Sequence, residues 1–292
     1  MGYGSSEAAP MTHFSGILDL DANYNVRMDI LLQTALEAAR RAGDLLLRKL
    51  PLSRQVRYKG ERDIVTDADE AAQQLIAEII HERFPKHAFL GEEGEHAAAV
   101  NSPTPTWIVD PLDGTTNYAR RYPSFCVSVG LAEAGVLRVG AIYDPARREM
   151  FYAQQGHGAF LQRGRAGAQP IQVSAIADLE ETLVGVDWAR DPVLRARTVA
   201  AVTRAAVTCR SVRATGSAAL ALAYLGAGWM DAYFHLMLMP WDVAAGALII
   251  REAGGVLTTP AGAEWTLGEP AVVAGNGKLQ AKLLEALALK EG

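Results

Sequence analysis

Apolar residues recur at helical spacing near the start of the chain, and two helices are predicted there. Residues 29–50 place most of their apolar side chains on one face, and Pro51 ends the pattern. A second helix is predicted from Thr66, a residue type that caps helix N-termini well, to Phe84, directly before a proline. Acidic side chains in its first turn favour the same start, because they face the positive end of the helix dipole.

The middle of the chain runs apolar or alternates with polar positions between turn residues, which predicts a meander of antiparallel strands. These strands cover residues 106–110, 124–132, 136–144 and 148–153. A Gly-rich polar linker follows at 164–170. Beyond it, strand-like and helix-like segments alternate at 183–186, 192–206, 209–212, 217–225, 232–236, 243–253 and 272–274. Such alternation is typical of an α/β fold in the second half of the chain.

The composition is that of a folded protein with a sizeable core, since 50% of the 292 residues are hydrophobic and 21% are charged. The net charge is −5, and no basic stripe is present, so we expect no nucleic-acid partner. Cys126 and Cys209 lie in apolar strand-like runs. We expect buried thiols there rather than a disulfide framework or a zinc site.

The longest apolar run, residues 218–239, is interrupted by two glycines, Asp231 and His235, and is expected in a soluble core rather than in a membrane. The first residues have neither the basic nor the apolar region of a secretory signal. Their Gly, Ser, Ala and Pro content predicts a flexible tail over residues 1–27. We therefore expect a cytoplasmic protein with no membrane partner.

Candidate chemistry is concentrated in the run from Trp107 to Asn117. Asp110 and Asp113 come at the end of a buried strand, which Pro111 is predicted to stop. Carboxylates hold hard cations such as Mg²⁺. The backbone N–H groups and hydroxyls that follow, from Gly114 to Thr116, suit phosphate oxygens. The loop therefore predicts metal-assisted chemistry on a phosphate group.

Two further acids lie at the borders of apolar segments. Glu92 follows the apolar run 88–90, and Asp242 opens the apolar segment after Pro240. Buried acids repel one another and are costly unless they are paired or bound to metal. No matching set of Lys and Arg accompanies them in the sequence, so bound cations are the expected partners.

These segments resemble those of the inositol monophosphatase family. The run from Asp110 to Asn117 is similar to that family's D-P-[LI]-D-G-T-[TS]-N motif, and four other segments match in order: 63–69 with Lys59 upstream, 91–93, 216–219 and 241–246. The resemblance extends from about residue 28 to the C-terminus. It implies an α/β (α+β) fold, the layered αβαβα sandwich of the inositol monophosphatase and fructose-1,6-bisphosphatase type. Within one catalytic unit, it suggests an N-terminal α+β subdomain with the metal-binding loop (28–165) and a C-terminal α/β subdomain (166–292).

The resemblance also implies the roles of individual residues. One Mg²⁺ is expected on Glu92, Asp110 and the carbonyl of Leu112, and a second on Asp110, Asp113 and Asp242, with Mn²⁺ as a substitute. Asp69 is expected to lie behind these ligands or to hold a third metal. The catalytic residues implied are Glu92, Thr115 and Asp113, where Glu92 and the Thr115 hydroxyl activate water. The substrate-binding residues implied are Glu92, Leu112, Asp113, Gly114, Thr115, Ala218, His235 and Asp242.

The resemblance implies a homodimer with lithium-sensitive phosphatase activity on a small phosphorylated polyol or sugar, such as inositol 1-phosphate. His235 and Met239 depart from the inositol-type pattern, which usually has Glu at the first of these positions and His or Arg at the second. His235 is therefore either a substrate contact or a core histidine. Fructose-1,6-bisphosphatase and histidinol-phosphatase activities remain alternatives. The branch acting on 3′-phosphoadenosine 5′-phosphate fits less well, because Thr116 stands where that branch has Lys. A non-enzymatic alternative is a regulatory protein that binds the transcription machinery.

Overall fold

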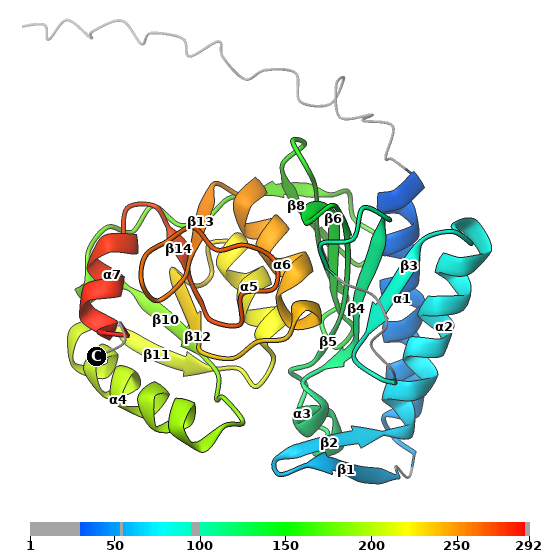
Figure 1. The fold of residues 1–292 in the computed structure, drawn as a ribbon, viewed down its shortest axis with the longest axis horizontal. Helices are drawn as coiled ribbons and strands as arrows, with labels where there is room; N and C mark the ends of the chain where they lie inside the picture. The colour runs from blue at the N-terminus through cyan, green and yellow to red at the C-terminus, as the bar shows by residue number, and fades with distance from the viewer. Residues whose placement is uncertain (1–29, 53–54, 95–99, 290–292) are drawn as a thin grey trace, which may run out of the picture.

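The computed structural model describes residues 30–52, 55–94 and 100–289, so the expected tail over residues 1–27 lies outside the described part. Five layers are stacked across the molecule (Figure 1). Helices α1 and α2 cover a seven-stranded sheet, α5 and α6 fill the middle, and α4 and α7 cover a five-stranded sheet at the far side. The αβαβα sandwich expected from the sequence is confirmed.

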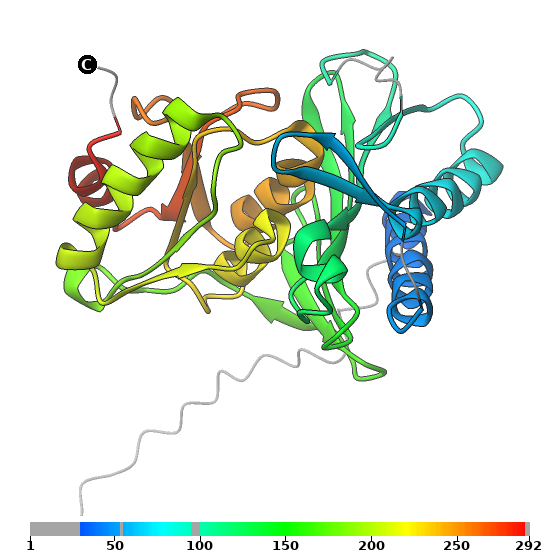
Figure 2. The ribbon, with the colours of Figure 1, turned by 90° about the horizontal axis from the view of Figure 1, so that it is seen from below.

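The first layer confirms both predicted N-terminal helices. Helix α1 (Ile30–Lys49) buries one apolar face against the sheet. Helix α2 (Asp67–Arg83) begins after Thr66, whose hydroxyl accepts a hydrogen bond from the Ala68 N–H at 3.2 Å. Between the two helices lies a hairpin, β1 (Val56–Gly60) and β2 (Asp63–Thr66). Figure 2 shows this hairpin projecting from the helix layer past the end of the seven-stranded sheet.

The seven-stranded sheet contains the predicted meander. Its order is β3-β4-β5-β6-β7-β8-β9, and every neighbouring pair is antiparallel except β3 and β4. The strands are β3 (Ala88–Gly91), β4 (Thr106–Asp113), β5 (Cys126–Glu133), β6 (Val136–Asp144), β7 (Glu149–Gln154), β8 (Ala159–Arg163) and β9 (Gln169–Ile171). Strand β9 still pairs with β8, although it lies beyond the proposed subdomain boundary at 165.

The prediction that Pro111 ends its strand is wrong. Strand β4 continues to Asp113, and its pairing with β5 shifts register between Asp110 and Asp113. A bulge of this kind accommodates a residue that cannot donate to the ladder and redirects the side chains around it. The irregular end of β4 therefore carries both aspartates.

The central helices pack closely on both sheets. Helix α5 spans Ala218–Gly226, and helix α6 spans Pro240–Glu252. Helix α6 begins three residues before the predicted start at 243, because Pro240 occupies a first-turn position, where its missing N–H costs nothing. A Cβ atom at Gly140 of β6 would lie 2.8 Å from the Ala245 carbonyl oxygen, so only glycine permits this approach of α6.

The five-stranded sheet has the order β11-β10-β12-β14-β13. Strand β10 is parallel to β11 and β12, whereas β14 is antiparallel to β12 and β13. Its strands are β10 (Leu183–Val186), β11 (Ser211–Ala214), β12 (Ala232–His235), β13 (Gly255–Thr258) and β14 (Val272–Asn276). Helices α4 (Pro192–Thr208) and α7 (Gln280–Leu287) cover its outer face (Figure 1).

The prediction of two buried thiols is confirmed. Cys126 and Cys209 are free and buried. Within the described part of the chain, no helix is long and apolar enough to cross a membrane.

Candidate functional site

The four predicted carboxylates meet where the first two sheet strands end beside α6. Glu92 directly follows β3, and its N–H donates to the Val109 carbonyl of parallel β4 at 3.1 Å. Asp110 and Asp113 lie at the end of β4, and Asp242 lies in the first turn of α6. The charges of Glu92, Asp113 and Asp242 all act on Asp110, so the four side chains form one acidic cluster.

Burial dominates the electrostatics of this cluster. It raises the pKa of Asp110 well above its usual range, and the neighbouring carboxylates raise this pKa further. The same two causes raise the pKa of Asp242 to about 8. For Asp113, burial raises the pKa to about 6, although hydrogen bonds from Ser217 and the α5 backbone oppose the change. Each ionised form is therefore disfavoured until a positive charge accompanies it.

The donor atoms of the cluster fit a hard divalent cation, because all of them are oxygens. One Asp110 oxygen accepts the Leu112 N–H at 2.9 Å, and one Asp242 oxygen accepts the Met239 N–H at 2.8 Å. The second oxygen of each accepts no hydrogen bond from any described residue. Over the described ranges, no three His, Cys, Asp or Glu side chains are arranged to hold a metal by themselves. Metal binding here is therefore a proposal, supported by the donor chemistry.

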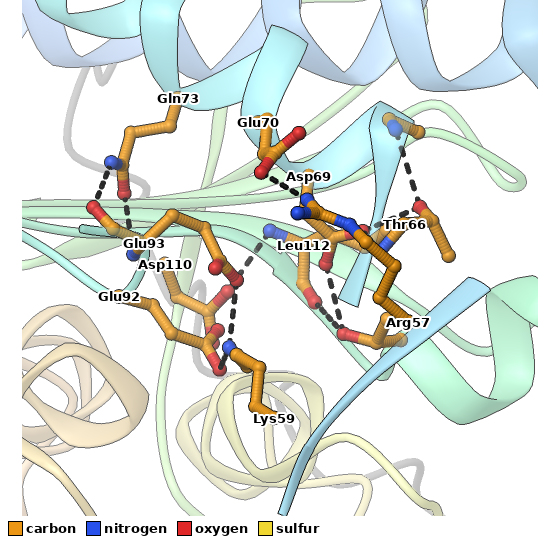
Figure 3. A network of polar contacts seen from close by, with 12 residues as sticks. Arg57, Lys59, Thr66, Asp69, Glu70, Gln73, Glu92, Glu93, Asp110 and Leu112 are labelled. Atoms are coloured by element: carbon orange, nitrogen blue, oxygen red, sulfur yellow. Dashed lines mark hydrogen bonds and ion pairs between the residues drawn. The ribbon is translucent and has the colours of Figure 1, made fainter. Parts of the chain in front are cut away.

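Thr115 and Asp69 lie beside the cluster. The Thr115 hydroxyl is 3.0 Å from both the Leu112 carbonyl and Asp69 Oδ1, and it can donate to either. Asp69 is fully buried, and its other oxygen accepts the Thr66 N–H at 2.9 Å (Figure 3). Burial raises the pKa of Asp69 to about 7. This placement behind Thr115 fits the first of the two roles expected for Asp69, a group that supports the ligands.

Gly114 separates Asp113 from helix α3 (Thr115–Ala119). Its φ of 94° lies in the left-handed region, and a Cβ atom there would lie 2.9 Å from the Ser124 carbonyl oxygen. Both constraints require glycine. Gly114 therefore makes the turn between β4 and α3, and the backbone N–H groups that were predicted to suit a phosphate lie at the start of α3.

Ser217 was not predicted as a functional residue, yet it holds a candidate metal ligand. Its hydroxyl donates to Asp113 Oδ2 at 2.8 Å, and the Ala219 N–H donates to the same oxygen at 2.5 Å. Ala218, the predicted substrate contact, lies between these two donors. The sequence signal was present, because Ser at the start of a predicted helix is a favoured capping residue.

Two cations approach Glu92, contrary to the expectation that the acids have no basic partners. Lys59 of β1 lies 2.9 Å from Glu92 and 2.8 Å from Glu93 (Figure 3). Arg190, which follows β10, lies 3.9 Å from Glu92. Both residues are distant in sequence from Glu92, so only the folded chain brings them together.

His235 lies at the end of β12 and is only 5% exposed. Its Nδ1 accepts the Met237 N–H at 3.0 Å, and the Trp188 backbone is a second hydrogen-bond partner. Burial is the main reason that the pKa of His235 falls to about 4, with the Arg190 charge contributing. The imidazole is therefore neutral and bound to the backbone. Its predicted contact with substrate stays a prediction.

Known proteins resemble the chain over nearly its whole length. The sequence profile of the inositol monophosphatase family matches residues 27–290. Inositol monophosphatase 1 of Solanum lycopersicum is 38% identical over 272 residues, which are 91% of this chain and 98% of that protein. Nus factor SuhB of Escherichia coli is 36% identical over 260 residues, 88% of this chain and 95% of that protein.

The fold is also that of solved structures. The crystal structure of inositol monophosphatase II from Staphylococcus aureus with bound inositol monophosphate aligns with a TM-score of 0.72 at 27% identity, covering 87% of this chain and 92% of that one. The layered fold, the cluster of carboxylates and the full-length sequence matches agree. The chain belongs to the inositol monophosphatase family.

Proposed function

We propose that the protein is a Mg²⁺-dependent phosphomonoesterase that hydrolyses a small sugar or polyol phosphate resembling inositol 1-phosphate. The observation that carries this proposal is the cluster of Glu92, Asp110, Asp113 and Asp242, in which burial and mutual repulsion raise three pKa values. A protein keeps such a cluster at a cost in free energy, and binding divalent cations relieves that cost. The inositol monophosphatases among its relatives support the same chemistry.

In this proposal, Glu92, Asp110 and the Leu112 carbonyl would hold one Mg²⁺, and Asp110, Asp113 and Asp242 would hold a second. When bound, the cations supply positive charge that offsets the phosphate and lowers the pKa of water. The chain itself orients the reactants. The Thr115 hydroxyl, held between Leu112 and Asp69, positions the attacking water, and Glu92 accepts its proton. Backbone N–H groups at Gly114 and Thr115 receive the phosphate.

The metal requirement tests this proposal directly. The purified protein should release phosphate from small phosphomonoesters with Mg²⁺ or Mn²⁺ and stop in excess EDTA. Asp113→Asn should reduce turnover by orders of magnitude, because it removes a charge from the second metal site. Asp231→Asn is a matched control, since Asp231 is also buried but binds the Leu183 N–H away from the cluster. Undiminished hydrolysis in EDTA would sink the metal mechanism.

The substrate within this class needs its own measurement. Inositol 1-phosphate, fructose 1,6-bisphosphate, histidinol phosphate and nucleotide 3′-phosphates, compared by kcat/KM with Mg²⁺, separate the three phosphatase activities that the sequence leaves open. We expect the inositol phosphate to rank first, because relatives named inositol monophosphatase match the chain over most of its length. A clear preference for another member of the panel would move the assignment to that branch.

A regulatory role is the second candidate, because Nus factor SuhB is 36% identical to the chain. Measurements of phosphate release and of protein binding distinguish the phosphatase function from the regulatory role. A chain that binds transcription factors but releases no phosphate from the panel, with or without Mg²⁺, would support the regulatory role.

We also propose that the protein is a homodimer. Light scattering of the purified chain measures its oligomeric state.

A further inference from the structure

Asp187 is a buried carboxylate that neither the sequence motifs nor the proposed metal sites include. It directly follows β10 and is only 8% exposed. Its Oδ1 accepts the Gly216 N–H at 2.7 Å, and its Oδ2 accepts the hydroxyls of Thr215 at 3.2 Å and Tyr233 at 3.4 Å. Among the described ion pairs, none includes Asp187. These three hydrogen bonds satisfy the buried carboxylate and at the same time hold its partners in place.

Those hydrogen bonds hold the short connection 215–217 between β11 and α5. Gly216 adopts a φ of 70°, which a residue with a side chain rarely takes. From the opposite side, the Asn117 amide of α3 donates to the Thr215 carbonyl at 2.9 Å and to the Ser124 carbonyl at 2.7 Å. The connection is therefore fixed between the end of β10 and the helix that follows the metal-binding loop.

The same connection determines how Asp113 is presented. The Ser217 hydroxyl and the Ala219 N–H both donate to Asp113 Oδ2, and Ala218 lies between them. A shift of residues 215–217 would move the Ser217 hydroxyl and the start of α5 that follows it, and would so weaken both hydrogen bonds to Asp113 Oδ2. A continuous chain of contacts thus runs from Asp187 through Gly216 and Ser217 to Asp113.

Asp231 shows that a carboxylate beside these strands can be buried without a contact to the acidic cluster. It is also 8% exposed, and its Oδ2 accepts the Leu183 N–H at 2.7 Å. Strands β10 and β12 are parallel, and Asp231 lies at their start whereas Asp187 lies at the end of β10. The two residues therefore have the same type and burial, but only Asp187 is linked to the acidic cluster.

We propose that Asp187 is a positioning residue of the phosphatase reaction, holding residues 215–217 so that Ser217 and Ala219 orient the Asp113 carboxylate. This inference rests on the function proposed above. Partners that orient metal ligands typically change metal affinity or activity by about 10–100-fold when they are removed. Because Asp187 acts through an intermediate segment, its removal is expected to have an effect near the lower end, about ten-fold.

The experiment compares Asp187→Ala, Asp187→Asn and Asp231→Ala in the full chain. Calorimetric titration with Mn²⁺ gives the metal affinity without turnover, and kcat, KM and Tm are measured alongside. Asp187→Ala should weaken Mn²⁺ binding about ten-fold and lower kcat. Asp187→Asn should restore most of both, because its amide oxygen can still accept the Gly216 N–H. Asp231→Ala should lower Tm and leave Mn²⁺ affinity within about two-fold of the parent.

The proposal is overturned if Asp187→Ala and Asp231→Ala change Mn²⁺ affinity alike, or if Asp187→Ala loses only Tm. If Asp187→Ala does not fold, Thr215→Val takes its place, since it removes the hydroxyl that contacts both Asp187 and the Ser217 carbonyl. Unchanged Mn²⁺ affinity in that variant also overturns the proposal. A parent protein that binds Mn²⁺ but hydrolyses nothing would contradict the phosphatase function instead, so the two failures are distinct.

Discussion

Lys59 places a positive charge beside Glu92, a proposed metal ligand. Its ammonium group contacts both Glu92 and Glu93. Burial acts to lower the pKa of Lys59, but the two carboxylates outweigh burial and raise this pKa. A divalent cation at Glu92 therefore has to compete with an ammonium supplied by the β1–β2 hairpin. Lys59 reaches the cluster from outside the metal-binding loop, so it can be removed without touching a proposed ligand.

Lys59→Gln is expected to strengthen Mg²⁺ binding. Partly exposed ion pairs contribute about 0.2–1 kcal/mol, which corresponds to an effect of up to about five-fold. The Mg²⁺ dissociation constant, measured by calorimetry, should fall by that factor. Arg57→Gln is the matched control, because Arg57 lies on the same hairpin but pairs with Glu70. Weaker Mg²⁺ binding in Lys59→Gln would mean that the lysine supports the metal site rather than competing with the metal.

His235→Ala separates the two roles considered for this histidine. Removing the imidazole takes away the acceptor of the partly buried hydrogen bond from the Met237 N–H, and a hydrogen bond of this kind typically contributes about 0.5–1.5 kcal/mol. We expect a lower Tm with the order of substrate preference unchanged. A reordered preference among inositol, fructose and histidinol phosphates, at unchanged Tm, would instead show that His235 contacts the substrate.

At the scale of elements, the packing of α6 on β6 determines where Asp242 lies. Gly140→Ala would bring a methyl group to 2.8 Å from the Ala245 carbonyl oxygen and 2.9 Å from its Cα. Because both contacts are backbone, the helix itself has to move, and such overpacking typically costs about 1–3 kcal/mol. Urea unfolding should show this loss. Gly167→Ala is the control, since no heavy atom lies within 4 Å of its added Cβ. Equal stability of the two variants would contradict this account.

Local sequence signals predicted the elements whose ends are marked by caps and prolines. Helices α1 and α2 fall within one residue of the expected positions, because periodicity, Thr66 and flanking prolines all act locally. The hairpin β1–β2 and helix α7 were not predicted. Strand β1 is exposed along its whole length, so it has no alternation of buried and exposed positions to reveal it.

At the scale of the whole molecule, buried acids make stability depend on pH. In the protein without bound metal, the pKa values of Asp113, Asp69 and Asp242 rise to about 6, 7 and 8 from an ordinary value of 3.8. An acid with a raised folded-state pKa binds its proton more tightly when folded. Its contribution to stability is therefore complete below about pH 4 and is lost as pH rises through the folded-state pKa.

We expect the Tm of the protein in EDTA to fall as pH increases from about 4 to about 8, and Mg²⁺ to raise Tm most at the upper end. The cation binds the deprotonated carboxylates and stabilises only the folded chain. Thermal unfolding across this pH range, with EDTA and with Mg²⁺, measures both effects. A Tm that does not change with pH in EDTA would contradict the raised pKa values.

The sequence by itself determined the layered fold class, the family and the four acids of the site. The four acids could be recognised because each depends on neighbours in the chain: a strand followed by Asp110 and Asp113, an apolar run before Glu92, and a helix start at Asp242. The layered fold and the family followed from the resemblance of these motifs to those of the inositol monophosphatase family. Carboxylates at element borders indicate buried charges that need partners, but they do not indicate which partners these are: Glu92 contacts Lys59 and Arg190.

Only the tertiary structure decided what surrounds those acids. Lys59 reaches Glu92 across 33 residues, and Ser217 reaches Asp113 across 104. The His235 imidazole binds the backbone, because the loop after β12 folds back and supplies the Met237 N–H. Such contacts depend on how layers pack and on which donors remain unsatisfied after packing, and neither is encoded in local periodicity. The order of residues thus supplies the proposed ligands, and the fold sets their orientation.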